Sequence, residues 1–459
     1  MKILFFAIEF APLNTTGNYR SLKFVKYLPE FGIEPVVITV DQESGIRMFG
    51  NRIDLKLLDE IGVDTFIYRI PAESVPTWII NNKILNFLRI YFNTDDKIAQ
   101  KWRKGIKANL NKIIAQHQPK AIYISLPPFS GHHLVDFLKK ETSLPIIVDM
   151  RDLWSQWSIS PWQSWLHYKN VLMKEQKLFQ QASKIIGVTP QLVEVFKETH
   201  PNVPQEKFEV IYNGHDIDLN FSDSINIPSL HSKDKIIIGY IGSFYYNPKA
   251  NEDRQKKWWK RPPHKWLYYA PVKEDWSYRS PLYFIKTLSH LLQENPKLRT
   301  RIIFEHVGKC PAWLPEMLEK YGVDDVFHSH GFVSYQEVLK IQQGFDFFLS
   351  TSEKVEGKEH YCLPSKTFDY LKEEKPILGF LTPGIQREFL PKIGFGILFD
   401  PDNIKVSSEK LEQVLKGDFE LTIQKDYILS FHRKNLTAQL ATIIKDVIRT
   451  PIKLAVENV

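Results

Sequence analysis

Residues 2–40, KILFFAIEFAPLNTTGNYRSLKFVKYLPEFGIEPVVITV, predict a strand, a helix and a second strand. The run 2–10 is almost continuously apolar, as expected of a strand that is covered on both faces of its sheet. A turn-rich loop follows, then an amphipathic helix from about Tyr19 to Phe31, which Gly32 ends, and then the apolar run 35–40. This order is the repeating unit of a parallel α/β sheet.

The same alternation continues along the chain in two blocks. Further strands of the first block are expected at 65–70, 121–126, 145–150, 184–189 and 208–213. After a polar stretch that we interpret as a linker, 223–235, the second block has expected strands at 236–244, 301–308, 326–331, 346–351, 376–381 and 396–399. We therefore predict an α/β protein with two Rossmann-like, doubly wound domains that face a cleft lined by the carboxyl ends of the strands.

The expected domain boundaries follow from these blocks. The first domain spans 1–215 and the second spans 216–430, with an insertion at 245–278. A final segment, 431–459, continues a helix predicted from about Tyr427 to Arg449, which could pack back across both domains.

The composition narrows the class of protein. The chain has 459 residues, of which 43% are hydrophobic and 25% charged, as in a globular protein. Its two cysteines, Cys310 and Cys362, lack metal-ligand spacing and form no disulfide framework, so a cytoplasmic location is expected. No apolar run approaches the roughly 18–20 residues that cross a bilayer, and Glu9 interrupts the first apolar run too early for a signal peptide. The net charge of +7 favours anionic partners.

Two segments interrupt the alternation. Residues 77–117 predict two basic, aromatic helices, which either form an outer layer of the first domain or bind a membrane surface or an acceptor. Residues 245–278 contain RQKKWWKRPPHKWLYY, in which basic and aromatic residues alternate. Such a cluster could stack on nucleic-acid bases, but in a chain of two Rossmann-like domains it favours a lid or a hairpin that faces the acceptor.

The stretch LPSKTFDYL, 363–371, carries the strongest local signal for a ligand. A helix is expected to begin at Ser365, which could cap it, and the free amides of a helix start attract phosphate. Lys366 adds a cation at that end. Asp369 lies one turn beyond Ser365 on the same face and could hold a ribose. The alternative is a capped helix with a surface lysine and aspartate.

A second helix start, YRSPLYFIKTL at 278–288, places Arg279 before Pro281. A guanidinium can grip a diphosphate as a planar fork. Together, Arg279 and Lys366 would form a cationic clamp that stabilises a departing nucleoside diphosphate without a metal. A surface salt bridge is the alternative for Arg279.

In the first domain, VDMRDLW, 148–154, places Arg151 and Asp152 just past a buried strand. They either bind ligand or hold the loop in place. His132 and His133 follow another strand end, and one of them could face the cleft. The loop 14–17 lacks the GxGxxG pattern of nicotinamide dinucleotide sites, and the acidic triplet at 216–218 follows an Asn-Gly turn, so neither that cofactor nor a metal site is predicted.

Taken in order, these motifs resemble glycosyltransferases of the GT-B fold, in particular the retaining family four. VDMRDLW, IYNGHDI (211–217) and LPSKTFDYL are similar to the family's D-F-R-D-x-W, I-x-N-G-V-D and P-S-K-x-F-E-Y-L elements. The resemblance implies that the second domain binds a nucleotide-diphosphate sugar and that the acceptor docks on the first. It also implies a reaction on one face of the sugar, in which the leaving phosphate helps to remove the acceptor proton.

The resemblance assigns roles to individual residues. Arg279 and Lys366 would bind the diphosphate, assisted by Ser365, while Asp369 would hold the ribose. Many members have two glutamates separated by seven residues; here Asp369 takes the second place and Tyr361 stands near the first, so that Glu356 or Glu359 would serve from a shifted position. The predicted catalytic set is Arg279, Lys366, Asp152, Arg151 and His132, and the predicted donor-binding set is Ser365, Asp369, Gly17, Gly242, Tyr361 and Glu359.

The prediction is thus a cytoplasmic, retaining, metal-independent glycosyltransferase of bacterial surface polysaccharide or glycolipid synthesis. Its expected partners are a nucleotide-diphosphate sugar, a glycan or lipid-linked acceptor and an anionic membrane surface at the inner face, but no nucleic acid. Two alternatives stay open: a nucleotide-sugar 2-epimerase on the same scaffold, and a non-catalytic protein that binds polyanions or lipid.

Overall fold

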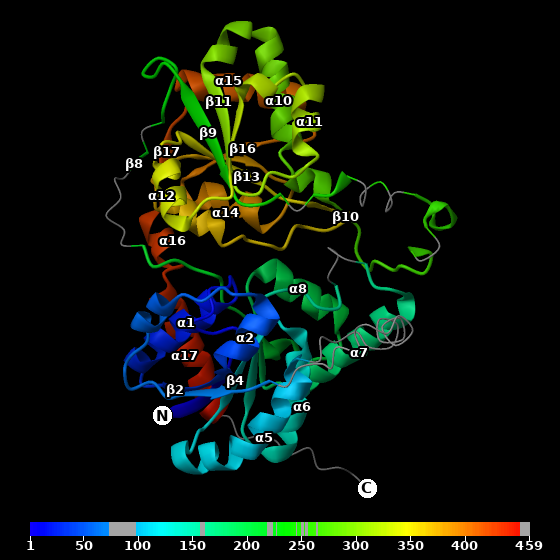
Figure 1. The fold of residues 1–459 in the computed structure, drawn as a ribbon, viewed down its shortest axis with the longest axis vertical. Helices are drawn as coiled ribbons and strands as arrows, with labels where there is room; N and C mark the ends of the chain where they lie inside the picture. The colour runs from blue at the N-terminus through cyan, green and yellow to red at the C-terminus, as the bar shows by residue number, and fades with distance from the viewer. Residues whose placement is uncertain are drawn as a thin grey trace. The chain divides into compact units, whose positions relative to one another are not determined.

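The computed structural model describes residues 1–72, 98–156, 161–217, 224–225, 227–244, 246–248, 252, 256–262 and 265–449. The chain forms two compact units (Figure 1). The first comprises Met1–Asp216, Leu267–Pro271 and Phe431–Val459, and the second comprises Ile217–Trp266 and Val272–Ser430. The split therefore lies one residue from the expected boundary, while a short piece of the insertion and the final segment join the first unit.

The first unit is built on a seven-stranded parallel sheet. Its strand order is β3 (Ile67–Ile70), β2 (Glu34–Val40), β1 (Lys2–Phe6), β4 (Ile122–Leu126), β5 (Ile146–Met150), β6 (Lys184–Gly187) and β7 (Phe208–Val210). The chain runs from β1 outward to β3 and then returns to β4, so the topological switch point lies between β1 and β4. Nearly all residues of β1, β2, β4 and β5 are buried, which explains their continuous apolar sequences.

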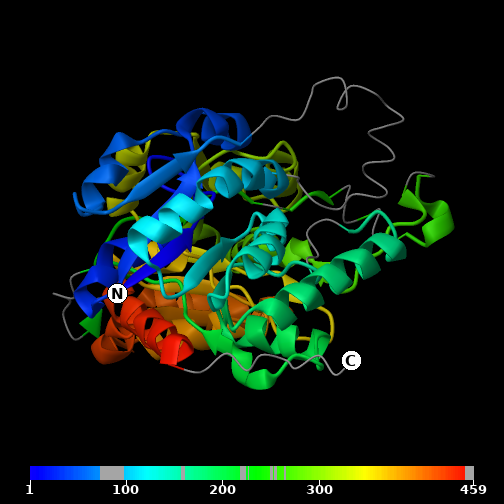
Figure 2. The ribbon, with the colours of Figure 1, turned by 90° about the horizontal axis from the view of Figure 1, so that it is seen from below.

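Helices cover both faces of this sheet. One face carries α1 (Asn18–Tyr27) and α17 (Arg433–Arg449), which lie side by side in Figure 2 and share a core with Phe5 and Tyr123. On the other face, Trp102 of α5 (Ile98–His117) packs edge-on against Phe6, with ring centroids 6.2 Å apart. Also described in this unit are the helices α2 (Gln42–Phe49), α6 (His132–Glu141), α7 (Trp165–Gln181) and α8 (Pro190–Thr199).

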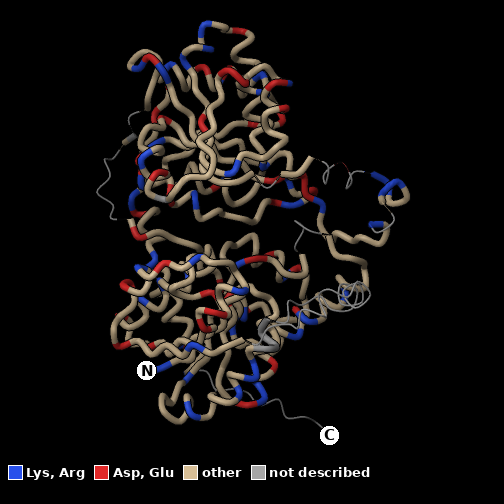
Figure 3. The backbone as a smooth tube through the Cα atoms, in the orientation of Figure 1, with Lys and Arg blue, Asp and Glu red and all other residues tan. Residues whose placement is uncertain are grey.

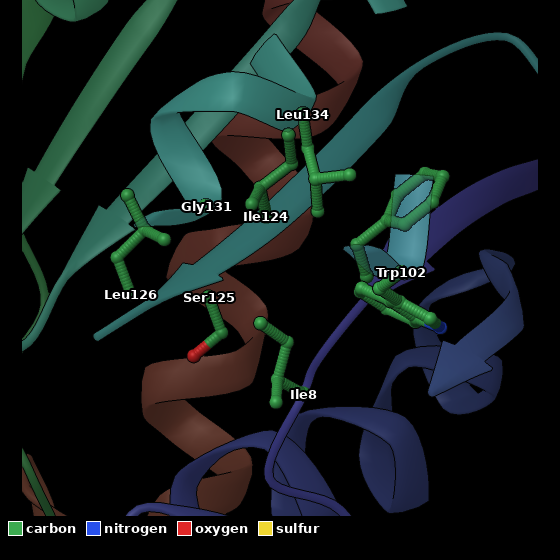
Figure 4. Close-up of a pocket in the computed structure, with 8 residues that line it drawn as sticks. Ile8, Trp102, Ile124, Ser125, Leu126, Gly131 and Leu134 are labelled. Atoms are coloured by element: carbon green, nitrogen blue, oxygen red, sulfur yellow. The ribbon is translucent and has the colours of Figure 1, made fainter. Parts of the chain in front are cut away.

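A small apolar hollow lies beside the switch point of the first unit. Ile8, Trp102, Ile124 and Leu134 are among the residues that line it (Figure 4). The hollow has no room for a water molecule. It is therefore a gap in the packing of α5 and α6 on the sheet and not a substrate site.

The second unit has a six-stranded parallel sheet. Its order is β12 (Phe327–Gly331), β11 (Ile302–Val307), β9 (Ile236–Ile241), β13 (Phe347–Thr351), β15 (Ile377–Phe380) and β16 (Gly396–Phe399). The switch point lies between β9 and β13. The helices described in this unit are α10 (Leu282–Glu294), α11 (Leu314–Lys320), α12 (Tyr335–Gln343), α13 (Lys366–Leu371), α14 (Ile385–Ile393), α15 (Ile404–Lys416) and α16 (Lys425–Leu429). Two short antiparallel pairs are also present: β10 (Glu274–Asp275) with β14 (Lys354–Val355), and β8 (Ser224–Ile225) with β17 (Leu421–Thr422).

The prediction of two doubly wound α/β units is confirmed. One helix prediction needs correction. The helix expected from Tyr427 to Arg449 is broken into α16 and α17, and α17 packs into the core of the first unit.

The basic segment 77–117 is described only from residue 98 onward. There α5 buries Trp102 and Ile106 completely, which agrees with the alternative that this segment is an outer layer of the first domain. Within the described residues, no helix combines the length and apolar character needed to cross a membrane.

Candidate functional site

The switch point of the second unit brings several ionisable side chains together. Gly242 directly follows β9, and Glu353 lies two residues beyond β13, the neighbouring strand. The carboxyl ends of strands at a switch point diverge and leave space for a ligand. Arg279 and His360 both reach Glu353 from loops outside the sheet.

Glu353 and Arg279 form the best defined contact of this site. Both carboxylate oxygens of Glu353 accept hydrogen bonds from Nη1 of Arg279, at 3.1 and 2.9 Å. Nε2 of His360 lies 3.0 Å from the same carboxylate. Burial opposes ionisation of Glu353, but the positive charge of Arg279 outweighs it and holds the pKa of the carboxyl well below its usual value. Glu353 is therefore ionised, and it fixes the orientation of Arg279.

Local structure positions Arg279. It ends a short 3₁₀ helix, Trp276–Arg279, which Asp275 caps through a hydrogen bond from the Ser277 amide at 2.9 Å. The carbonyl of Arg279 accepts a hydrogen bond from the Thr351 hydroxyl at 2.9 Å, which ties this helix to the end of β13. Pro281 then precedes α10, as the sequence predicted for a helix start.

His360 is held in place by a close approach of two backbones. Its amide donates to the carbonyl of Pro383 at 2.8 Å, and its carbonyl accepts from Ile385 at 3.0 Å. Gly384, between those two partners, has φ +140°, and a Cβ atom there would lie 2.2 Å from the His360 carbonyl oxygen. Only glycine fits this position, and it fixes the loop that leads to Lys366.

Lys366 is the second cation of the site. It begins α13, and its ammonium lies 3.8 Å from the centroid of the Tyr240 ring. Among the described residues, no carboxylate lies within ion-pair distance of it. Burial and the nearby charge of Arg279 both lower the pKa of Lys366 well below its usual value. An anion placed here would relieve both effects, because it offers the opposite charge that the ammonium lacks.

The expected capping role of Ser365 is wrong. Ser365 occupies the N-cap position, but its backbone is already helical, with φ −58° and ψ −31°, and its side chain caps nothing. A capping side chain needs an extended backbone to reach back to the helix amides. The Ser365 side chain is instead exposed, one turn from the exposed Asp369, whose carboxylate lies 4.0 Å from Lys372.

The other predicted donor-binding residues of this unit differ in their contacts and exposure. Gly242 has φ +116°, and its carbonyl accepts a hydrogen bond from the His306 ring at 2.8 Å. The Tyr361 ring stacks on His360 with centroids 5.9 Å apart. Glu359 is exposed, and Glu356 is an exposed partner of Lys273 at 3.6 Å.

Sequence reasoning missed Glu353 and His360. The signal for Glu353 was present, because STSE, 350–353, places an acid just beyond a buried strand, as in the Asp152 stretch. His360 carried no such signal, since its position depends on the backbone of Pro383–Ile385, which is distant in the sequence.

In the first unit, Arg151 is engaged by the loops of its own unit. Its guanidinium pairs with Glu9 at 2.9 Å and donates to the carbonyls of Leu126 and Pro127 at 3.2 and 2.5 Å. Gly17 packs directly on this pair, because a Cβ atom at Gly17 would lie 2.0 Å from Arg151 Nη1. Of the two roles that the sequence left open for Arg151, the structure therefore supports the one that holds the loop.

Asp152 and His132 lie near this cluster. Burial raises the pKa of Asp152, with Glu9 adding to the rise and Arg151 opposing it. The ring of the buried His132 lies at a tilt to two neighbouring rings, those of His133, at 3.8 Å between centroids, and the buried Trp154, at 5.2 Å. His132, His133 and Asp136 could offer ligand atoms within 4.8 Å of one another to a metal ion, although Lys177 already pairs with Asp136 at 2.8 Å.

Comparison with known proteins supports this reading of the fold. Residues 22–219 match the model of the family described as Glycosyltransferase Family 4. No curated protein matches the chain in sequence.

Solved structures match over the whole chain. The lipopolysaccharide outer core galactosyltransferase WaaB, in its apo form, is 13% identical with a TM-score of 0.55, over 97% of this chain and 100% of that one. Sucrose-phosphate synthase from Thermosynechococcus elongatus is 12% identical with a TM-score of 0.56, over 97% and 98%. The pneumococcal O-GlcNAc transferase GtfA, solved with UDP and GlcNAc, is 10% identical with a TM-score of 0.53, over 98% and 99%.

Proposed function

We propose that this chain, whose residues 22–219 match the model of Glycosyltransferase Family 4 and whose fold matches that of solved glycosyltransferases, transfers a sugar from a nucleoside diphosphate donor with retention of the anomeric configuration. The donor diphosphate would lie against Arg279 and Lys366 in the second unit. A glycan or lipid-linked acceptor would use residues of the first unit, with Asp152 and His132 nearest to the reacting groups.

The observation that carries this proposal is the pair of cations at the switch point of the second unit. Glu353 neutralises one of them, Arg279, and holds it in a fixed orientation. Lys366 has no carboxylate partner among the described residues, and an anion bound beside it would favour its charged form. A diphosphate is an anion that such a preorganised pair would bind.

In the proposed reaction, the bond between the anomeric carbon and the diphosphate oxygen breaks, and the acceptor oxygen forms a bond to that carbon on the same face. The acceptor proton passes to the leaving diphosphate. Negative charge grows on that diphosphate as its bond breaks, and the Arg279 and Lys366 cations stabilise it more strongly than in the ground state. We infer that these side chains do this without a metal ion, so that chelators leave the rate unchanged.

The biological context is part of the proposal. WaaB is named for the outer core of lipopolysaccharide, and a chain with the same fold could act on a related glycan or glycolipid. We propose bacterial surface polysaccharide or glycolipid synthesis as the setting.

The test is a thermal-shift screen of the full-length protein with the diphosphates of uridine, guanosine, adenosine and thymidine. We expect one of them to raise the unfolding temperature, since a ligand that binds only the folded state stabilises it. Arg279→Ala should abolish that shift. No shift with any diphosphate in the unmodified protein would contradict the proposal.

The nucleotide sugar of the base so identified is then supplied with and without acceptors. Retained anomeric configuration in the product, detected by NMR, is expected, as is full activity in the presence of a chelator. Formation of an epimer without acceptor would instead assign the chain to the 2-epimerases.

A further inference from the structure

Three exposed tryptophans gather on one loop of the insertion. The tryptophan loop, defined as 256–262 with 265–267, contains Trp258, Trp259 and Trp266, which are 56%, 52% and 44% exposed. The ring of Trp258 contacts the other two edge-on, at centroid distances of 5.7 and 6.1 Å. Large aromatic side chains of this kind usually cover a core or an interface, so a half-exposed cluster indicates a surface that something else covers.

The charge on the tryptophan loop has one sign. The loop contains five cations, and the sequence has no acidic residue between Lys256 and Leu267. Figure 3 shows blue without red along this part of the chain. The Lys257 ammonium lies 5.2 Å from the centroid of the Trp259 ring, so the cationic and aromatic groups are interleaved in space as well as in sequence. The five cations are Lys256, Lys257, Lys260, Arg261 and Lys265.

The residues from Leu267 to Pro271, directly after Trp266, belong to the first unit. Tyr269 and Trp162 exchange two backbone hydrogen bonds, at 2.8 and 2.9 Å, and the Tyr269 ring packs on Tyr168 at 4.9 Å. Leu267, two residues before Tyr269, is 59% exposed. Ordered backbone therefore presents this apolar side chain to solvent.

The residue types of the tryptophan loop distinguish between two anionic partners, nucleic acid and a lipid bilayer. Bases of nucleic acid need flat aromatic faces on which to stack. Here the tryptophans contact one another edge-on, and the loop also exposes Leu267, which has no aromatic face. Indole rings and leucines enter the boundary between headgroups and acyl chains, while lysines reach anionic headgroups. We propose that the tryptophan loop docks the protein on the surface of an anionic lipid bilayer.

The first test is co-sedimentation of the full-length protein with vesicles in the absence of donor and acceptor. Vesicles of phosphatidylcholine with phosphatidylglycerol should bind it with a blue shift of tryptophan emission, and vesicles of phosphatidylcholine alone should bind it weakly. High salt should weaken the binding, because it screens the headgroup charge. Tighter binding to single-stranded DNA than to the anionic vesicles would overturn the proposal in favour of a nucleic-acid surface.

Matched variants test the two halves of the surface. The double change Trp258→Ser with Trp259→Ser should weaken vesicle binding at least tenfold, whereas Phe332→Ser, which alters an aromatic that is 90% exposed on another loop, should leave it unchanged. Replacing Lys256, Lys257 and Lys260 by glutamine should cost about a hundredfold on anionic vesicles. The same change at the exposed Lys297, Lys340 and Lys405 is the control.

Equal losses in the loop variants and their controls would overturn the proposal. Unfolding temperatures equal to that of the unmodified protein establish that the variants fold. Because the vesicle assay uses neither donor nor acceptor, its result is separate from the test of transferase activity.

Discussion

In the candidate site Arg279 is paired with Glu353, and this ion pair reduces the charge that Arg279 can offer to a ligand. The ionised carboxylate cancels most of its charge at a distance while leaving its geometry fixed. Lys366 has no such partner among the described residues. A bound anion would therefore gain most from the charged form of Lys366, which that anion itself favours, and Arg279 would serve mainly as an oriented hydrogen-bond donor.

We predict that Lys366→Ala lowers kcat/KM for the nucleotide-sugar donor by about a hundred- to a thousandfold, the loss that follows removal of one group that stabilises transition-state charge. Lys372→Ala, at the other end of α13, removes a lysine that lies on the surface beside Asp369. It should change the rate less than twofold. Steady-state kinetics on both variants measure the difference, and equal rates would remove Lys366 from the reaction.

Glu353→Gln should destabilise the protein by about 3 kcal/mol, because removing one partner of a buried ion pair leaves the other charge unpaired. The control is Glu356→Gln, whose exposed pair with Lys273 should be worth less than about 1 kcal/mol. Chemical denaturation at neutral pH gives both values. Loss of the same free energy in both variants would show that the Arg279 contact is not a structural ion pair.

At the scale of single residues, the sequence predicted Arg279 and Lys366 but missed Glu353, whose carboxylate fixes the orientation of Arg279. Arg279 and Lys366 stand at helix starts that proline and the local pattern reveal. The contact between Arg279 and Glu353 joins residues 74 positions apart, and it depends on how two loops fold over the sheet. A pattern that is local in sequence carries no such information.

At the scale of elements, the strands were predicted closely and the helix ends were not. A strand that is buried on both faces requires a continuous apolar run, and each expected run contains an observed strand. A helix end depends on backbone angles that neighbouring loops set. Ser365 has the right side chain to cap α13, but its helical backbone makes that contact impossible.

The carboxylate of Asp216 links the helices α17 and α1. Its carboxylate pairs with Arg433 and Lys23, both at 2.8 Å, and accepts from the Tyr27 hydroxyl at 3.1 Å. Burial would raise the pKa of Asp216, but the charges of Arg433 and Lys23 prevail and lower it from 3.8 to about 2. Since the folded state binds the proton less tightly than the unfolded state, this carboxylate stabilises the fold above about pH 4 and loses that effect as the pH falls towards 2.

Asp216→Asn should therefore lower the free energy of unfolding by about 2 kcal/mol at neutral pH. The difference from the unmodified protein should shrink as the pH falls from 4 towards 2, because both proteins then carry a neutral side chain at 216. Asp426→Asn, on α16, is the control. Denaturation curves over this pH range provide the test, and a difference that does not depend on pH would contradict the assigned charge contacts.

At the scale of the whole molecule, the chain builds its first unit from segments that lie far apart. Residues up to Asp216, the short piece Leu267–Pro271 and the final segment from Phe431 form one body. The repeated alternation of strands and helices revealed two units, because each unit repeats locally along the sequence. It could not assign the last helix to one unit, since the amphipathic pattern of α17 shows which face is buried and not against what.

The structure assigns α17 to the first unit, and this assignment predicts how substitutions in α17 change the unfolding of that unit. Leu440, Leu436 and Ile444 are buried in the same core as Phe5 and Tyr123 of the first sheet. Leu440→Ala should cost about 2–5 kcal/mol and lower the unfolding transition of the first unit, although it lies within the last 20 residues of the chain.

Leu288→Ala, at a fully buried position of α10, should lower the transition of the second unit instead. Leu429→Ala, at a position that is 40% exposed, should leave both transitions near their original temperatures. Scanning calorimetry of the full-length variants distinguishes these outcomes: if Leu440→Ala lowered the transition that Leu288→Ala lowers and left the other unchanged, α17 would not belong to the core of the first unit.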